Sequence, residues 1–210
     1  MRKSLCAIVF VLSSAPSFAT VNQIEYLYGR GSPRSSVQAG NGSDQEGSQG
    51  AEWSADFLHL AANHFYVGVG GGEFHSGDNV SGTVVPNVNS TISCKMTSIL
   101  GLARIDLSPS PKLMTYAIAG IGWVRNSLMI TSAPATPIVD SAKETFGYAG
   151  GVGVDLALTD RLFIGVEARY QGSERQSFEM TPEGVAATGR TSISVPLSVF
   201  LVGLKAGIKY

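Results

Sequence analysis

The chain has few charged residues: they make up 15% of the sequence, against ~25% in soluble domains. It carries 15 basic and 16 acidic side chains, and the basic ones form no run or patch, which argues against a nucleic-acid partner. Beyond residue 19 no apolar run approaches the ~20 residues of a transmembrane helix. Glycine is abundant instead, with 25 residues. Low charge, high glycine and short alternating segments favour a β-barrel over a helical membrane protein.

Cysteine is scarce as well, with only Cys6 and Cys94 among the 210 residues. Because Cys6 lies in a segment that we expect to be removed, Cys94 is left without a partner for an intramolecular disulfide. We interpret Cys94 as a small, half-buried hydrophobic side chain rather than as a nucleophile or a metal ligand.

The first 19 residues have the pattern of a secretory signal peptide. Arg2 and Lys3 precede an apolar run from Leu5 to Leu12, and the run is followed by Ser17-Phe18-Ala19. A positive segment, a short apolar segment and small residues at the cleavage site predict cleavage after Ala19. We therefore predict a signal peptide at 1–19 and one domain at 20–210.

Eight segments of that domain alternate apolar and polar residues with the period of a β-strand. They are 22–31, 51–61, 64–74, 92–107, 112–130, 145–158, 162–171 and 193–210. The connections between them alternate in length. Short ones lie at 62–63, 108–111 and 159–161, and long polar ones at 32–50, 75–91, 131–142 and 172–191. This pattern predicts an all-β fold, an eight-stranded antiparallel up-and-down transmembrane barrel with short periplasmic turns and long extracellular loops.

The last eleven residues give the clearest single strand. Apolar residues occupy every second position and end on an aromatic residue: Phe200, Val202, Leu204, Ala206, Ile208 and Tyr210. Such a strand has one apolar face for lipid and one polar face for the lumen, as expected for the strand that closes a barrel.

These segments resemble the small outer-membrane β-barrel family that includes the OmpA transmembrane domain, OmpX and the opacity proteins. The similarity is best over 116–123, 146–162, 166–170 and 202–210. It implies location in the outer membrane of a Gram-negative cell, contact with outer-membrane lipid and lipopolysaccharide, and recognition by the barrel-insertion machinery. It also implies a terminal assembly signal at Phe200, Val202, Leu204, Ile208 and Tyr210. A host or surface ligand would bind through the loops.

Charged residues fall on the face of the strands that we assign to the lumen. An eight-stranded barrel is narrow enough to be filled by side chains, and charges shielded from water need partners. We therefore predict a luminal salt-bridge network that fills the barrel, made of Glu25, Asp155, Glu167, Arg169, Lys205 and Lys209.

The sequence offers little for catalysis, and we predict no catalytic, cofactor-binding or metal-binding residues. The glycine-rich segments 68–72 and 150–153 do not complete a dinucleotide motif. His59, His64 and His75 are expected at different strand ends. A structural, adhesive or surface-interaction role is therefore the favoured function. A narrow channel for small solutes is the first alternative, and a lipid A-modifying enzyme built on the cluster His75-Ser76 with Asp78 is the second.

Overall fold

The protein forms a closed antiparallel β-barrel, as predicted. The computed structural model describes residues 22–33, 49–76, 81–85, 88–110, 112–132 and 136–210. In this part of the chain, eight strands pair in the order β3-β2-β1-β11-β8-β7-β6-β5, and a further β3–β5 pairing closes the cylinder. They are β1 (Asn22–Pro33), β2 (Gly50–Ala62), β3 (Phe65–Ser76), β5 (Val88–Pro109), β6 (Leu113–Ser132), β7 (Thr136–Ala157), β8 (Leu162–Ser173) and β11 (Ser198–Lys209).

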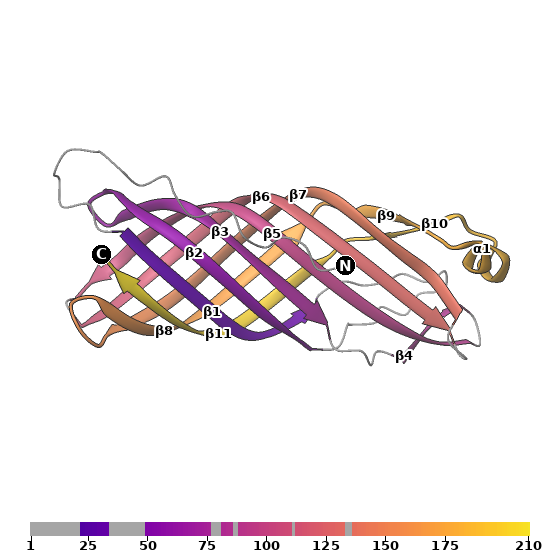
Figure 1. Cartoon of the computed structure of the whole chain (residues 1–210), viewed down its shortest axis with the longest axis horizontal. Helices are drawn as coiled ribbons and strands as arrows, with labels where there is room; N and C mark the ends of the chain where they lie inside the picture. Colours follow the sequence, from indigo (N-terminus) through magenta and orange to yellow (C-terminus); the bar gives the residue numbers. More distant parts are fainter. Residues whose placement is uncertain (1–21, 34–48, 77–80, 86–87, 111, 133–135) are drawn as a thin grey trace, which may run out of the picture.

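The two ends of the barrel differ in length and build (Figure 1). At the left end in the figure, short turns join β2 to β3 and β7 to β8, and the C-terminus lies beside them. Here the backbone N–H of Asn22 donates to the carbonyl oxygen of Tyr210 at 2.9 Å. At the other end β5, β6 and β7, with 20 to 22 residues each, run well past the strands of 12 or 13 residues beside them. They form a tall wall on one side of the barrel.

Four shorter elements lie at the tall end. β4 (Ser81–Val85) pairs with β5, while β9 (Gln176–Glu179) and β10 (Ser192–Val195) form a separate two-stranded ribbon. The ribbon carries helix α1 (Pro182–Thr188) at its tip. The Thr181 hydroxyl caps this helix by accepting from the N–H of Gly184, and Gly189 ends it with a φ of 70°.

Alternation along each strand sends one set of side chains outward and the other inward. The outward set is apolar and aromatic over the body of the barrel, as in Tyr26, Trp53, Trp123, Val166 and Leu204, each at least 42% exposed. The inward set is buried. This distribution is the reverse of a soluble barrel, because the large apolar side chains lie on the outside.

Four sequence-based expectations about strands and connections are wrong. The segment 75–91, expected as a connection, contains β4 and the first residues of β5. The segment 131–142 is mostly strand, because β6 runs to Ser132 and β7 begins at Thr136 rather than at residue 145. The segment 172–191 contains β9 and α1. The last predicted strand is two strands, β10 and β11, because Pro196 lacks the backbone N–H that a continuous ladder would require.

Two expectations lie outside the described residues: the signal peptide at 1–19 and most of the loop at 32–50. In the part of the chain that the structure covers, no helix is long and apolar enough to cross a membrane.

Candidate functional site

The lumen near the short-turn end contains a group of ion pairs centred on Arg104 of β5. Its guanidinium group donates to three carboxylates: Glu25 at 2.5 Å, Asp155 at 2.8 Å and Asp106 at 2.9 Å. The Arg104 side chain is fully buried. A guanidinium group offers five N–H donors in a planar fork, so one side chain can bind carboxylates from three directions. Arg104 therefore connects β1, β5 and β7 across the lumen.

Lys205 of β11 forms ion pairs with two of these carboxylates, those of Glu25 and Asp155. Its Nζ lies 3.2 Å from Glu25 Oε2 and 2.9 Å from Asp155 Oδ1. The aromatic ring of Tyr116 contacts both cations, with its centroid 3.8 Å from the Arg104 guanidinium carbon and 4.0 Å from Lys205 Nζ. An aromatic face and carboxylates together stabilise a buried cation, whereas the ring alone or a carboxylate alone would not offset the loss of water.

A second group of ion pairs lies next to the first. Arg169 of β8 donates to Glu167 at 2.5 Å and, across the lumen, to Asp56 of β2 at 2.6 Å. The Tyr116 hydroxyl donates to the other oxygen of Glu167 at 2.6 Å. Tyr116 thus joins the two groups into one luminal charge network. Its members are Glu25, Asp56, Arg104, Asp106, Tyr116, Asp155, Glu167, Arg169 and Lys205.

Glycine makes room for this network at one position in particular. A Cβ atom on Gly153 would lie 2.1 Å from the Tyr116 hydroxyl oxygen and 2.3 Å from the adjacent ring carbon. Gly153 pairs with Tyr116 on one side and with Glu167 on the other. The close approach of the tyrosine ring to β7 therefore depends on the missing side chain.

Five of the six residues predicted for the luminal network lie in these ion pairs: Glu25, Asp155, Glu167, Arg169 and Lys205. Lys209 does not join them in the described structure. Its Nζ lies 3.7 Å from Met114 Sδ and 5.6 Å from the centroid of the Phe163 ring, nearer the short-turn end.

The sequence reasoning missed four members of the network: Asp56, Arg104, Asp106 and Tyr116. For Arg104 and Asp106 the signal was present, because both lie on the polar face of an alternating strand, two residues apart. Asp56 shows the same signal in β2. For Tyr116 there was none, because the strand that carries it is apolar on both faces.

Toward the tall end, the interior contains a large apolar cluster beside a few hydrogen-bonded polar side chains. The inner face of the tall wall packs against the β9–β10 ribbon in one buried cluster, which includes Leu128, Ile130, Val139, Phe178, Ile193 and Val195. Phe178 and Val195 on the ribbon are completely buried, as are Ile130 and Val139 on the wall. Burying these side chains stabilises the strand extensions, since each gains roughly 1.5–3 kcal/mol from burial.

The residues predicted to form the assembly signal all lie on the outer face of β11 or at its end. Phe200, Val202, Leu204, Ile208 and Tyr210 are between 39% and 71% exposed. They form one apolar row along the last strand, in position to contact lipid or another protein. Their recognition by insertion machinery stays a prediction.

The residues weighed for catalysis or metal binding do not converge. His75 is exposed on the outer face of β3, whereas Ser76 points inward and its hydroxyl accepts the backbone N–H of Cys94 at 2.8 Å. Both belong to β3 and not to a loop, and Asp78 lies outside the described residues. Cys94 is buried in the apolar cluster. Within the described ranges no three His, Cys, Asp or Glu side chains are placed to hold a metal ion.

The chain is similar to a known family and to several solved structures. The family described as outer membrane protein beta-barrel domain matches residues 5–206. The solved structure of OprG from Pseudomonas aeruginosa is similar with a TM-score of 0.54 at 14% identity, covering 91% of this chain and 95% of OprG. Neisserial surface protein A gives 0.47 at 14% identity over 91% and 97% of the two chains. Ail of Yersinia pestis gives 0.47 at 12% identity over 90% and 98%. Curated protein sequences give no match.

Proposed function

Because this chain belongs to the outer-membrane β-barrel family, we propose that it is a non-catalytic barrel with a filled lumen that presents a rigid surface outside the cell. The family match covers nearly the whole chain and places the protein in the outer membrane. The role that we propose within that membrane is surface interaction, with adhesion as its simplest form.

The tall wall is the observation that carries this proposal. A tilted strand needs about 9–11 residues to cross a bilayer, whereas β5, β6 and β7 have 20 to 22. About half of each strand therefore stands clear of the membrane. Short turns face the periplasm in barrels of this type, so we place the tall end outside the cell.

The packing of the ribbon against the wall supports a preformed binding surface. Thr181 donates from its hydroxyl to the carbonyl oxygen of Pro137 at 2.6 Å, and its backbone N–H donates to the carbonyl of Ile138 at 3.0 Å. Lys143 on the wall pairs with Glu179 on the ribbon at 3.1 Å. These contacts hold α1 at the tip of the structure, and a surface that is ordered before binding pays less entropy when a ligand arrives.

The experiment compares adhesion of cells that carry the wild-type barrel with adhesion of cells carrying a variant in which 182–190 is replaced by a Gly-Ser turn. Immobilised host matrix proteins and glycans serve as probes. We expect the wild type to increase adhesion to at least one probe and the variant to lose most of that increase. A barrel with Asp160→Asn, changed at the opposite end, is the matched control and should adhere like the wild type. Equal adhesion with and without the barrel would contradict the proposal.

A narrow channel is the second candidate, and one observation favours it. Within the described residues, the side-chain amide of Gln23 and the hydroxyl of Ser54 are buried without a hydrogen-bond partner. Both lie on inward-facing positions of β1 and β2. Buried polar groups of this kind are places where water enters a structure, so a thin hydrated path past the luminal charge network is the competing interpretation.

A further inference from the structure

We propose that the barrel binds an anionic phospholipid at its short-turn end, with the phosphate in a basic pocket and an acyl chain in an apolar groove on the outer wall. This site is separate from the surface that we propose for adhesion. The orientation proposed above, with the short turns toward the periplasm, assigns this site to the periplasmic leaflet. No other part of the proposal rests on that orientation.

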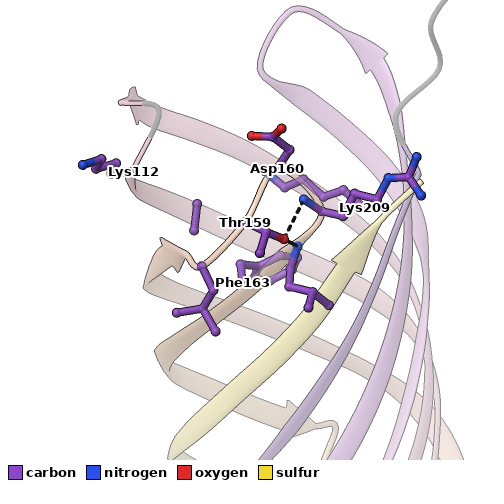
Figure 2. Close-up of a pocket in the computed structure, with 9 residues that line it drawn as sticks. Lys112, Thr159, Asp160, Phe163 and Lys209 are labelled. Atoms are coloured by element: carbon purple, nitrogen blue, oxygen red, sulfur yellow. Dashed lines mark hydrogen bonds between the residues drawn. The ribbon is translucent and has the colours of Figure 1, made fainter.

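The basic pocket lies at the turn between β7 and β8 and has a volume of about 410 Å³. Figure 2 shows Lys112 on one side of it and Lys209 on the other, with Thr159, Asp160 and Phe163 between them. Arg161 also lines the pocket. The sequence pattern of 159–161 predicts only a short connection and gives no sign of this pocket.

The turn that carries Arg161 is held in place by hydrogen bonds. The Thr159 hydroxyl accepts the backbone N–H groups of Arg161 at 3.2 Å and Leu162 at 3.0 Å (Figure 2). The carbonyl oxygen of Arg161 accepts from the backbone N–H of Lys209 at 2.7 Å, which ties the turn to the end of β11. The backbone of the pocket is therefore formed before any ligand binds.

The charges in the pocket favour an anion. Lys112, Arg161 and Lys209 line it together with a single carboxylate, that of Asp160. Lys112 and Arg161 are exposed, while Lys209 is partly covered beside the Phe163 ring. Three cations around one small pocket match a phosphate, which arginine binds with two parallel N–H donors and lysine as a point charge.

A shallow hollow adjoins the pocket on the side of the outer wall. It shares Arg161 and Leu162 with the lining of the pocket and adds Ile208, which faces outward. Leu162 pairs with Ile208 there, and the next outward pair along the same two strands is Ile164 with Ala206. The hollow therefore lies directly beside the residues that line the groove.

The groove has a volume of about 530 Å³ and is almost entirely apolar. It lies across β7, β8, β11 and β1, and its lining includes Leu156, Ile164, Leu204, Ala206 and Tyr26. Ala206 is the small residue in the outward row of β11, between Leu204 and Ile208, so the wall is indented at that point. An acyl chain fits an apolar indentation whose open side faces lipid.

A phospholipid uses both parts. A free phosphate would fill the basic pocket and leave the groove unused, whereas an acyl chain alone would ignore the three cations. The basic pocket lies at the end of the barrel, at the depth where lipid headgroups meet water, and the groove lies farther along the hydrocarbon-facing wall. The basic pocket at the barrel end and the apolar groove on the wall match, in that order, the headgroup and the acyl chain of a lipid.

The experiment measures lipid bound to the purified, delipidated barrel in non-ionic detergent by native mass spectrometry. Phosphatidylglycerol is titrated against phosphatidylcholine, which carries the same chains and no net charge. We expect tighter binding of phosphatidylglycerol. Removing two of the three cations with Arg161→Gln and Lys112→Gln should weaken that binding roughly 30-fold. Arg190→Gln, an exposed arginine at the far end, should leave it unchanged.

The groove is tested separately with Ala206→Phe, which fills it, against Ala119→Phe on the outer face of β6, away from the groove. Both positions face outward. Only the first should lower phosphatidylglycerol binding, with folding of both checked by heat-modifiable migration on gels. Equal binding of the two lipids, no loss in the double variant, or no loss in Ala206→Phe would each overturn the proposal. Because these measurements are made in detergent, they hold whichever way the barrel is oriented in cells.

Discussion

Replacing Arg104 tests whether the lumen is dry. Arg104 is fully buried and donates to Glu25, Asp106 and Asp155 while it packs against the ring of Tyr116. The substitution Arg104→Gln keeps a polar side chain but removes the charge and most of the donors. Glu25 and Asp155 would keep Lys205 as a partner, whereas Asp106 would lose the ion pair that Arg104 provides.

The expected loss in the free energy of unfolding follows from the carboxylates that the substitution leaves without Arg104. Breaking a buried ion pair by removing one partner costs about 3–5 kcal/mol, because the remaining charge stays buried and uncompensated. Arg104 serves three carboxylates, so we expect the free energy of unfolding to fall by at least that amount. An exposed ion pair is worth only about 0–1 kcal/mol. The pair of Lys143 with Glu179, whose side chains are 39% and 79% exposed, provides that comparison.

The assay is urea unfolding in lipid vesicles, followed by tryptophan fluorescence. Trp53 and Trp123 both face outward and are 42% and 65% exposed, so both would leave lipid when the barrel unfolds. Arg104→Gln should lower the midpoint far more than the control Lys143→Gln. Adding Asp106→Asn to Arg104→Gln should restore part of the loss, since it removes one of the unpaired charges. If Arg104→Gln and Lys143→Gln were equally mild, the luminal charges would be hydrated and the filled-lumen argument would be refuted.

Three further predictions concern other parts of the molecule. Gly153→Ala should destabilise the barrel by about 1–3 kcal/mol in the same assay, since its Cβ would collide with the Tyr116 hydroxyl, whereas Gly150→Ala, with open space around it, should be tolerated. Deleting Tyr210 should reduce the amount of barrel in the outer-membrane fraction, and normal levels would remove the assembly role from that residue. Epitope tags within 182–190 should bind antibody on intact cells and a tag at Asp160 should not, and the opposite result would invert the orientation.

The architecture was predictable from local patterns. Period-two alternation and turn-rich connections identify the strands, and an even number of short antiparallel strands with a closing C-terminal strand identifies a barrel. Five of the six charges selected from the polar faces lie in ion pairs, because in a narrow barrel every inward charge is close to another. The individual partners were not predictable, since they depend on which side chains reach across the lumen, as Arg169 reaches Asp56.

The tall end was mispredicted for a physical reason. Serine, threonine and proline near 131–142 are turn-forming residues by local propensity, and they predict a loop. In the structure Ile130 and Val139 pair across β6 and β7 and are buried against Phe178 of the ribbon. That ribbon comes from a part of the chain some forty residues away, so tertiary packing decides the outcome over local propensity. The strand β6 is apolar on both faces, so the sequence does not indicate which face points inward. Tyr116 was not predicted for that reason.

Single-channel recording in planar bilayers tests the filled lumen most directly. Charged residues fill the barrel near the short turns, and a large apolar cluster with a few hydrogen-bonded polar side chains fills it near the tall end. The purified barrel, with its fold confirmed by heat-modifiable migration, should therefore insert without producing step currents at any applied voltage that the bilayer tolerates. Reproducible conductance steps of one size would contradict the account and establish a channel.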